Sequence, residues 1–396
     1  MSMNEQMKES EESILHTYNR FPVVFEKGQG CYLYDSEGKE YLDFAAGIAV
    51  NSLGYHYPGY DEALKDQIDK LMHISNLYYN EPIIEAGAKL VKASKMSKAF
   101  FTNSGTEAIE GALKAAKKYA YVRDGHADHE IIAMNHSFHG RSIGALSVTG
   151  TAHYREPFEP LMGGVKFADF NNLESVKAQI TDKTCAIITE VVQGEGGIYP
   201  AKKEFLEGLR QICDEKDIML IFDEIQCGMG RTGHYFAWQA YGVQPDIMTS
   251  AKALGCGVPV GAFVLNEKAA KASLEPGDHG TTYGGNPFVC AAVSKVFDIY
   301  ENDKIIEHVQ EMTPYLEQKL DEIVAKHECA ATRRGMGFMQ GIVIQDRPVG
   351  EVVKAALAKG LLVISAGSDV LRIVPPLVIT KEHIDKMAAI LDECME

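Results

Sequence analysis

Short apolar runs alternate with helical patterns through the middle of the chain, and this alternation constrains the fold more than any other feature. Short buried strands separated by helices indicate a doubly wound α/β sheet. In such a sheet, ligands bind at the carboxyl ends of the strands. We expect strands at residues 99–101, 130–134, 185–192, 218–222, 245–250 and 260–264.

The two ends of the chain follow a different pattern. The first 50 residues contain two short strand-like runs around a turn at residues 35–38. After residue 300, a long helical stretch leads to strands expected at residues 337–344 and 361–364 and to a final helix from Lys381. We therefore predict an α/β protein whose large domain, residues 51–300, holds a doubly wound and mostly parallel sheet. A smaller α+β domain would comprise residues 301–396, with the N-terminal segment 1–50 packed against it.

Charge and composition argue against several kinds of partner. Among 396 residues, 55 are acidic and 39 are basic, so the net charge is −16. Because this field repels phosphate backbones and anionic lipids, we expect no nucleic-acid or membrane partner. No apolar run approaches the ~18 residues of a membrane-spanning helix, and the polar, acidic start does not resemble a secretory or transit peptide. Eight cysteines without a CxxC pair are typical of free thiols, so we expect a cytoplasmic protein.

The segment Asn103-Ser-Gly-Thr-Glu107 follows an expected strand and opens an expected helix. Backbone N–H groups at a helix N-terminus, together with the hydroxyls of Ser104 and Thr106 and the small Gly105, suit an anion. Ser104 and Glu107 also fit a capping box, which would be purely structural. The segment is neither a Walker loop nor a GxGxxG motif, so it does not indicate a nucleotide.

Two charged residues lie where strands are expected to end. Asp223 follows the apolar run 218–222. Its carboxylate could hold a metal, pair with a base or bond a protonated ring nitrogen, or it could cap a helix or form a structural ion pair. Lys252 lies in a small, glycine-rich stretch, residues 249–261, with no carboxylate nearby in the sequence. A lysine kept from water has a lowered pKa and can act as a nucleophilic amine; the alternative is a lysine that reaches solvent from a loop.

An aromatic ring, two histidines and an arginine lie close together in residues 136–141. Phe138 could stack on a planar ligand and Arg141 could bind a carboxylate through two hydrogen bonds. A core phenylalanine and a surface arginine are the alternative interpretations. His136 and His139 raise the question of a metal, but no third ligand has suitable spacing, so we expect no metal site.

Three further segments place polar groups in positions suited to a ligand. Glu195 lies in a glycine-rich loop and could be a mobile gate or a solvated turn residue. Residues 279–287 form a hydroxyl- and glycine-rich segment, suited to a phosphate or to a plain turn. Arg372 lies on an expected strand among apolar neighbours, where an arginine needs an anionic partner. Together the motifs suit one ligand with a phosphate, a ring with a basic nitrogen and an aldehyde, and pyridoxal phosphate has all three.

With these motifs the chain resembles the class III, fold-type I aminotransferases that depend on pyridoxal phosphate. The resemblance extends in order from about Phe21 to the C-terminus. Its most specific pieces are residues 103–108, 137–141, 223–233, 245–261 and 279–287.

The resemblance implies how the cofactor ring is held. Lys252 would form a Schiff base with the cofactor and then move a proton during transamination. Asp223 would bond the pyridinium nitrogen and keep it protonated. Phe138 and Ile225 would pack on the two faces of the ring, and Gln226 would lie near its phenolic oxygen.

The resemblance also implies a shared phosphate site. Ser104, Gly105 and Thr106 would hold the phosphate, joined by Thr282 from the neighbouring subunit. Thr281 would lie close to the substrate. The expected assembly is therefore a homodimer with shared active sites.

Two arginines are implied to bind the substrates. Arg141 would bind the α-carboxylate of the amino donor, and Arg372 that of glutamate or 2-oxoglutarate, while Glu195 would cover Arg372 when the other substrate is present. The implied reaction moves the terminal amino group of N-acetylornithine to 2-oxoglutarate by a ping-pong mechanism in arginine biosynthesis. One alternative is a transaminase for another ω-amine, such as 4-aminobutyrate, ornithine or succinylornithine. The other is a non-catalytic or regulatory protein that binds pyridoxal phosphate, which would be expected to lose Lys252 or an arginine.

Overall fold

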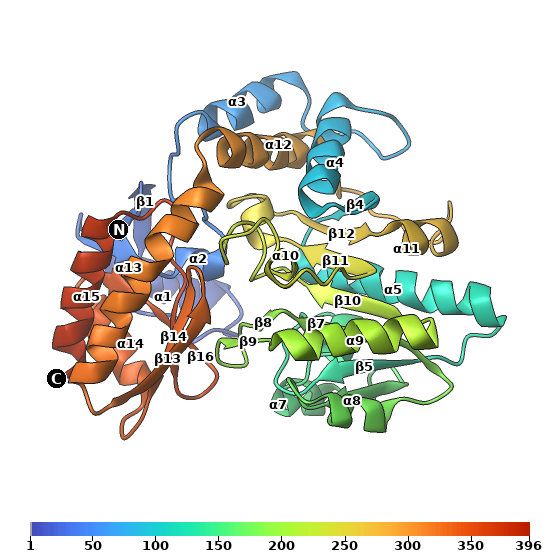
Figure 1. The fold of residues 1–396 in the computed structure, drawn as a ribbon. Coiled ribbons are helices and arrows are strands. Elements are labelled where there is room, and N and C mark those ends of the chain that lie inside the picture. Colours follow the sequence, from blue (N-terminus) through green and yellow to red (C-terminus); the bar gives the residue numbers. More distant parts are fainter. Residues whose placement is uncertain (1) are drawn as a thin grey trace.

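A seven-stranded sheet forms the centre of the molecule in the computed structural model, which describes residues 2–396 (Figure 1). Its strand order is β4-β12-β11-β10-β7-β5-β6. Neighbouring strands from β11 to β6 are parallel, whereas β12 runs antiparallel to both β11 and β4. The prediction of a mostly parallel α/β sheet is confirmed. The strands are β4 (Lys98–Thr102), β5 (Glu130–Met134), β6 (Val165–Ala168), β7 (Thr184–Glu190), β10 (Met219–Asp223), β11 (Ile247–Ser250) and β12 (Gly261–Leu265).

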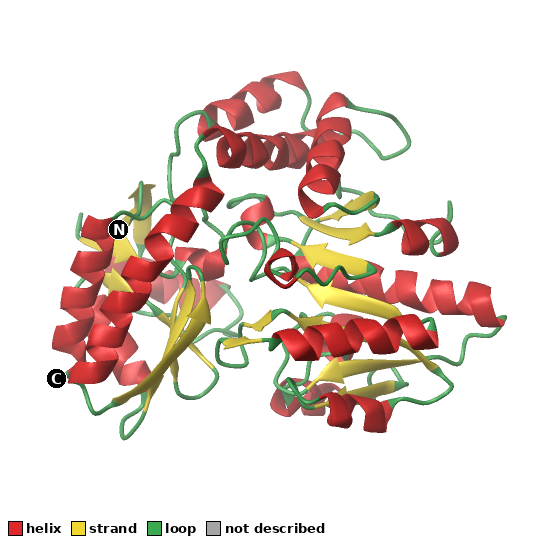
Figure 2. Cartoon of the chain, in the orientation of Figure 1, coloured by secondary structure: helices red, strands yellow, loops and turns green. Residues whose placement is uncertain are grey.

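Helices lie on both faces of this sheet (Figure 2). Successive side chains of a strand point to opposite faces. In β10, Ile221 therefore packs in one core with α5 (Gly105–Asp124), and Phe222 packs in the other with α9 (Lys203–Lys216). Because both faces are covered, β7 and β10 are buried at every position and mostly apolar, which is why they were recognisable as short apolar runs.

The C-terminal part forms a second sheet with the order β13-β14-β17-β16 and antiparallel pairing throughout. Its strands are β13 (Ala330–Met336), β14 (Met339–Ile344), β16 (Ile364–Ala366) and β17 (Val370–Ile373). The helices of this part are α13 (Ile305–Lys326), α14 (Val349–Ala358) and α15 (Lys381–Met395). Arg372 lies on β17, so the strand expected around it is confirmed.

The N-terminal strands form a third sheet with one strand from the C-terminal part. Its order is β1 (Phe25–Gln29), β2 (Tyr32–Asp35), β3 (Glu40–Asp43) and β15 (Leu361–Leu362). The single strand expected at residues 361–364 is therefore wrong: β15 pairs with β3, whereas β16 pairs with β17 in the second sheet. The division at residues 50 and 300 stays a prediction.

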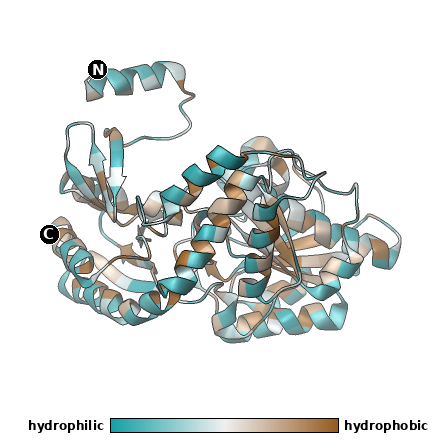
Figure 3. Cartoon of the chain, turned by 90° about the horizontal axis from the view of Figure 1, so that it is seen from above, coloured by the Kyte–Doolittle hydropathy of each residue, from teal (hydrophilic) through white to brown (hydrophobic). Residues whose placement is uncertain are grey.

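The remaining elements connect these sheets. Helix α1 stands apart from the body of the molecule and buries none of its residues (Figure 3). Within residues 2–396, none of the helices combines the length and the apolarity needed to cross a membrane. The remaining elements outside the three sheets and their helices are α1 (Met3–Ser13), α2 (Ala46–Ala49), α3 (Tyr60–Lys70), α4 (Glu81–Ser94), α6 (Ile143–Ser147), α7 (Ala152–Arg155), α8 (Leu173–Gln179), β8 (Val192–Gln193), β9 (Tyr199–Pro200), α10 (Trp238–Tyr241), α11 (Glu267–Ala272) and α12 (Pro287–Asn302).

Candidate active site

A cavity of about 460 Å³ opens at the carboxyl ends of the central strands. The segments that line it follow β4, β5, β7, β10 and β11, as expected for a ligand site in a doubly wound sheet. Ten of the residues singled out from the sequence line this cavity: Ser104, Gly105, Thr106, Phe138, Arg141, Glu195, Asp223, Ile225, Gln226 and Lys252.

The N-terminus of α5 forms one end of the cavity. Ser104 is the N-cap, and its hydroxyl accepts a hydrogen bond from the N–H of Glu107 at 3.3 Å. The Glu107 carboxylate accepts from the N–H of Asn103 at 2.7 Å and not from Ser104, so the reciprocal capping box is not formed. A Cβ added at Gly105 would come within 2.9 Å of Ile225 Cδ1, so glycine leaves room for this side chain at the cavity wall. The first turn of a long helix thus directs its unpaired N–H groups at the cavity, an arrangement suited to a phosphate.

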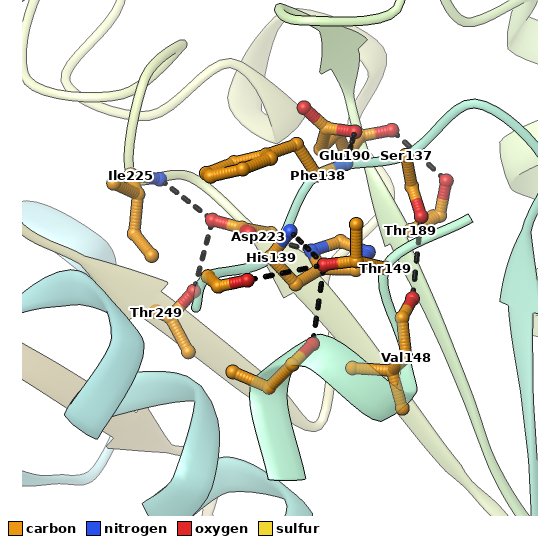
Figure 4. A network of polar contacts seen from close by, with 12 residues as sticks. Ser137, Phe138, His139, Val148, Thr149, Thr189, Glu190, Asp223, Ile225 and Thr249 are labelled. Carbon is orange, nitrogen blue, oxygen red and sulfur yellow. Dashed lines mark hydrogen bonds and ion pairs between the residues drawn. The ribbon is translucent and has the colours of Figure 1, made fainter. Parts of the chain in front are cut away.

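Asp223 ends β10 and is held by three donors (Figure 4). Its Oδ1 accepts from the N–H of Ile225 at 3.0 Å and from the hydroxyl of Thr249 at 3.2 Å. Its Oδ2 lies 2.7 Å from Nδ1 of His139. Because the carboxylate is buried and fully directed by these donors, it is an oriented negative charge at the cavity wall.

His139 is a functional residue that the sequence pattern did not identify correctly. The pattern raised it only as a possible metal ligand, whereas the structure pairs it with the Asp223 carboxylate. Burial alone would lower the pKa of His139, but the hydrogen bond to Asp223 and the nearby carboxylates raise it overall. Within residues 2–396, the one cluster of possible metal ligands is Asp124, His126 and His129, none of which lines the cavity.

Glu190 is a second residue that sequence reasoning missed. It ends β7, is paired in register with Asp223 on the adjacent β10, and lines the cavity. Burial raises the pKa of its carboxyl to about 7. Its position in the sequence could have identified it, because Glu190 is a charged residue that comes after six residues of a buried strand.

Lys252 lies two residues after the end of β11 and lines the cavity, and its side chain is only partly buried. Desolvation of its ammonium lowers the pKa to about 8. Its backbone has φ of +49°, a conformation that costs a non-glycine residue on the order of 1 kcal/mol and is concentrated at functional sites. The structure therefore presents this lysine as an accessible amine with a raised neutral fraction.

Arg372 of β17 is not among the residues that line the cavity, but it pairs with Glu195, which does line it. Nη1 of Arg372 bonds Oε1 of Glu195, and Nη2 lies 3.3 Å from Oε2. Gln226 accepts a further hydrogen bond from Nη1 at 3.1 Å. Burial would raise the pKa of Glu195, but the charge of Arg372 lowers it overall, so the carboxylate stays ionised against the guanidinium. The anionic partner that the sequence required for Arg372 is Glu195.

Arg141 also lines the cavity, but it is exposed and has a different environment. Its guanidinium lies over the rings of Tyr154, at 4.0 Å, and Phe138, at 5.3 Å. It forms no ion pair with any carboxylate within residues 2–396. Stacking on two rings orients the planar group and leaves its N–H donors available to a carboxylate.

Thr281 and Thr282 do not line this cavity. Thr281 accepts hydrogen bonds from Asn103 at 3.1 Å and from the N–H of Gly284 at 3.2 Å, and Thr282 is exposed. The two threonines lie in a neighbouring surface pocket with the first turn of α5. Their roles stay predictions that depend on a second subunit.

The site thus combines an accessible amine with a lowered pKa, an anion cradle, an oriented carboxylate and two guanidinium groups. The pattern of the family described as aminotransferase class-III matches residues 14–395. The chain belongs to the class III aminotransferases. The enzyme class predicted from the sequence motifs is confirmed.

Three relatives illustrate the breadth of this similarity. The chain is 47% identical to acetylornithine aminotransferase of Clostridium acetobutylicum, over 98% of this chain and 100% of that protein. It is 44% identical to succinylornithine transaminase of Yersinia pseudotuberculosis, over 94% and 92% of the two chains. A solved structure of ornithine aminotransferase from Toxoplasma gondii, with PLP at partial occupancy at its active site, superposes with a TM-score of 0.95 at 28% identity, covering 100% of this chain and 94% of that one.

Proposed function

We propose that the cavity binds pyridoxal phosphate. Each part of that molecule meets a suitable group: the phosphate meets the N-terminus of α5, the ring nitrogen meets Asp223, and the aldehyde meets the amine of Lys252. The close fit of Gly105 against Ile225 supports this, because a Cβ at that position would fill the cradle. The similar Toxoplasma gondii enzyme holds this cofactor at its active site. When bound, the cofactor supplies an electron sink for removing a proton from the amine-bearing carbon.

The residues of the chain would then divide the remaining work. Phe138 and Ile225 would hold the two faces of the ring, and Gln226 would lie near its phenolic oxygen. Lys252 moves the proton that is transferred during the reaction, for which a pKa of about 8 is well suited. Asp223 keeps the ring nitrogen protonated.

The amino donor that this site suits best is N-acetylornithine, with 2-oxoglutarate as the acceptor. The observation that carries this proposal is that Arg372 is neutralised by Glu195 whereas Arg141 has no carboxylate partner within residues 2–396. The donor reacts at its far end and the acceptor at Cα, so one arginine cannot anchor both α-carboxylates without displacing the reacting carbon. A free Arg141 for the donor, and a covered Arg372 that is released for 2-oxoglutarate, satisfy both geometries.

The donor preference is tested by comparing kcat/KM for N-acetylornithine, succinylornithine, ornithine and 4-aminobutyrate with 2-oxoglutarate as acceptor. We expect N-acetylornithine to give the highest value, because Arg141 binds its α-carboxylate and its blocked α-amine carries no charge. 4-Aminobutyrate has no α-carboxylate that could reach Arg141, so its kcat/KM should be lower by on the order of a hundredfold. A higher value for 4-aminobutyrate or ornithine would overturn the assignment.

We further propose a homodimer in which Thr282 completes the phosphate site of the partner. Large apolar side chains are exposed beside this threonine: Leu77 is 84%, Tyr79 94% and Tyr283 62% exposed. Asn76 bonds the carbonyl of Gly284, which ties the two segments together. Such a patch suits a second copy of the chain.

Sedimentation equilibrium of the purified protein should therefore give about twice the chain mass of 43.5 kDa. Placing charges in the patch with Leu77→Glu and Tyr79→Glu should shift the protein toward monomers and weaken cofactor retention. A matched change at an exposed residue of the isolated α1, Glu9→Lys, should leave the mass unchanged. A monomeric wild type with full activity would contradict the proposal.

A further inference from the structure

Glu190 connects two parts of the site that are far apart in the sequence. Its Oε1 accepts a hydrogen bond from the N–H of Gly194 at 3.1 Å. Its Oε2 accepts from the N–H of Phe138 at 3.4 Å. Gly194 directly precedes Glu195, which covers Arg372, and Phe138 lies in the segment that leads to Arg141. One buried carboxylate therefore joins the loop that carries Glu195 to the segment that carries Arg141. Figure 4 shows its contact with Phe138.

The loop that carries Glu195 has little room to adjust. A Cβ at Gly194 would lie 2.6 Å from the side-chain amide of Gln226, and a Cβ at Gly196 would lie 2.6 Å from the carbonyl oxygen of His136. Gln226 in turn contacts both Glu195 and Arg372. If Gly194 moves, it displaces Gln226, and Gln226 then shifts the Glu195–Arg372 pair that it contacts.

We propose that Glu190 is a positioning residue that keeps Glu195 over Arg372 while the amino donor binds, and so enforces the choice between the two arginines. The inference rests on the proposed function, because it assigns the two arginines to two substrates. Holding both segments requires an ionised carboxylate, because each of its two oxygens can then accept a hydrogen bond from one N–H group and neither oxygen carries a hydrogen. A glutamine has the same shape, but its NH₂ group would face one of these donors and break that contact.

The test compares Glu190→Gln with the matched control Glu224→Gln. Glu224 is also buried and also accepts from two backbone N–H groups, those of Ala237 and Trp238, both at 2.8 Å. It does not line the cavity, so its replacement measures the general cost of losing such a contact. The quantity to measure is the half-reaction ratio, which is kcat/KM for N-acetylornithine divided by kcat/KM for glutamate, each in single-turnover experiments.

We expect the half-reaction ratio to fall on the order of tenfold in Glu190→Gln and to stay unchanged in Glu224→Gln. The donor half-reaction suffers because an uncovered Arg372 binds the donor in a non-productive orientation, whereas glutamate needs Arg372 uncovered. Equal losses in both half-reactions of Glu190→Gln would show a merely structural role and overturn the inference.

A binding measurement gives a readout that does not need turnover. Glutarate has the two carboxylates of 2-oxoglutarate but no reacting carbonyl, and calorimetry of the holoenzyme measures its affinity. If Glu195 covers Arg372 less often, glutarate should bind Glu190→Gln about threefold tighter or more. Unchanged or weaker binding would overturn the inference. If the wild type fails to transaminate N-acetylornithine, the proposed function fails instead, and the glutarate titration still reports on the loop.

The pH dependence supplies an independent check. Below its pKa of about 7, Glu190 carries a proton and, like glutamine, loses one acceptor. The groups that face it are His139, Asp223, Cys227 and Lys252. All four remain in Glu190→Gln, so a pH effect that comes from these groups is present in both proteins. The half-reaction ratio of the wild type should rise between about pH 6 and pH 8 more steeply than that of the variant, and identical profiles would contradict the inference.

Discussion

Replacing Lys252 with alanine is expected to reduce transamination on the order of ten-thousandfold or more, because the change removes both the nucleophilic amine and the group that moves the proton. The lowered pKa of about 8 leaves roughly a tenth of this lysine neutral at pH 7, far more than an ordinary lysine with a pKa of about 10.4. The side chain makes no hydrogen bond within residues 2–396, so its loss should not prevent folding. Single-turnover rates of both half-reactions and the absorbance of the bound cofactor measure the effect.

Two experiments separate this role from a general loss of structure. Added methylamine should partly restore the Lys252→Ala variant, since a small amine can enter the space left in the cavity. The control Lys268→Ala removes a lysine that pairs with Asp217 at the surface and should retain normal rates. Borohydride reduction of the wild type, followed by peptide mapping, should attach the cofactor to Lys252. Attachment to any other lysine would show that the assignment is wrong.

Replacing Asp223 with alanine is expected to lower kcat on the order of a thousandfold, or about 4 kcal/mol of transition-state stabilisation. The reason is that the buried carboxylate keeps the ring nitrogen protonated, and a protonated ring is the better electron sink. The variant should also bind the cofactor less tightly, because the cavity wall loses its charge complement to that nitrogen. Stopped-flow rates with saturating cofactor separate the loss of chemistry from the loss of binding.

The comparison with Asp223→Asn makes this prediction specific. Asparagine keeps the size of the side chain and can still contact the N–H of Ile225 and the hydroxyl of Thr249, but it carries no charge. It should therefore fold like the wild type and lose nearly as much kcat as alanine. An asparagine variant with near-normal kcat and bound cofactor would exclude the electrostatic role and reduce Asp223 to a packing residue.

Much of the central sheet could be predicted because its signals are local. A strand buried on both faces is mostly apolar, so β7 and β10 can be recognised from the sequence. Two strands lacked this signal. Edge strand β6 is short, and β13 is mostly polar because it lies at the edge of the second sheet, so both depend on pairing with a neighbour. The run at 361–364 is apolar as a whole, and only the neighbouring strands decide that it divides between two sheets.

The site shows the same division between local and tertiary information. The sequence by itself determined which charged residues lie at or just after the strand ends, because Asp223 and Lys252 interrupt apolar or small-residue segments where a parallel sheet binds its ligands. Only the tertiary structure decided the partners: His139 meets Asp223 across 84 positions, and Glu195 meets Arg372 across 177. Nothing local specifies such pairs, since a buried charge requires a counter-charge but does not indicate from where in the chain it will come. Here the counter-charge comes from the loop after β8, which packs against β17. That packing covers Arg372 with Glu195, whereas Arg141 stays free.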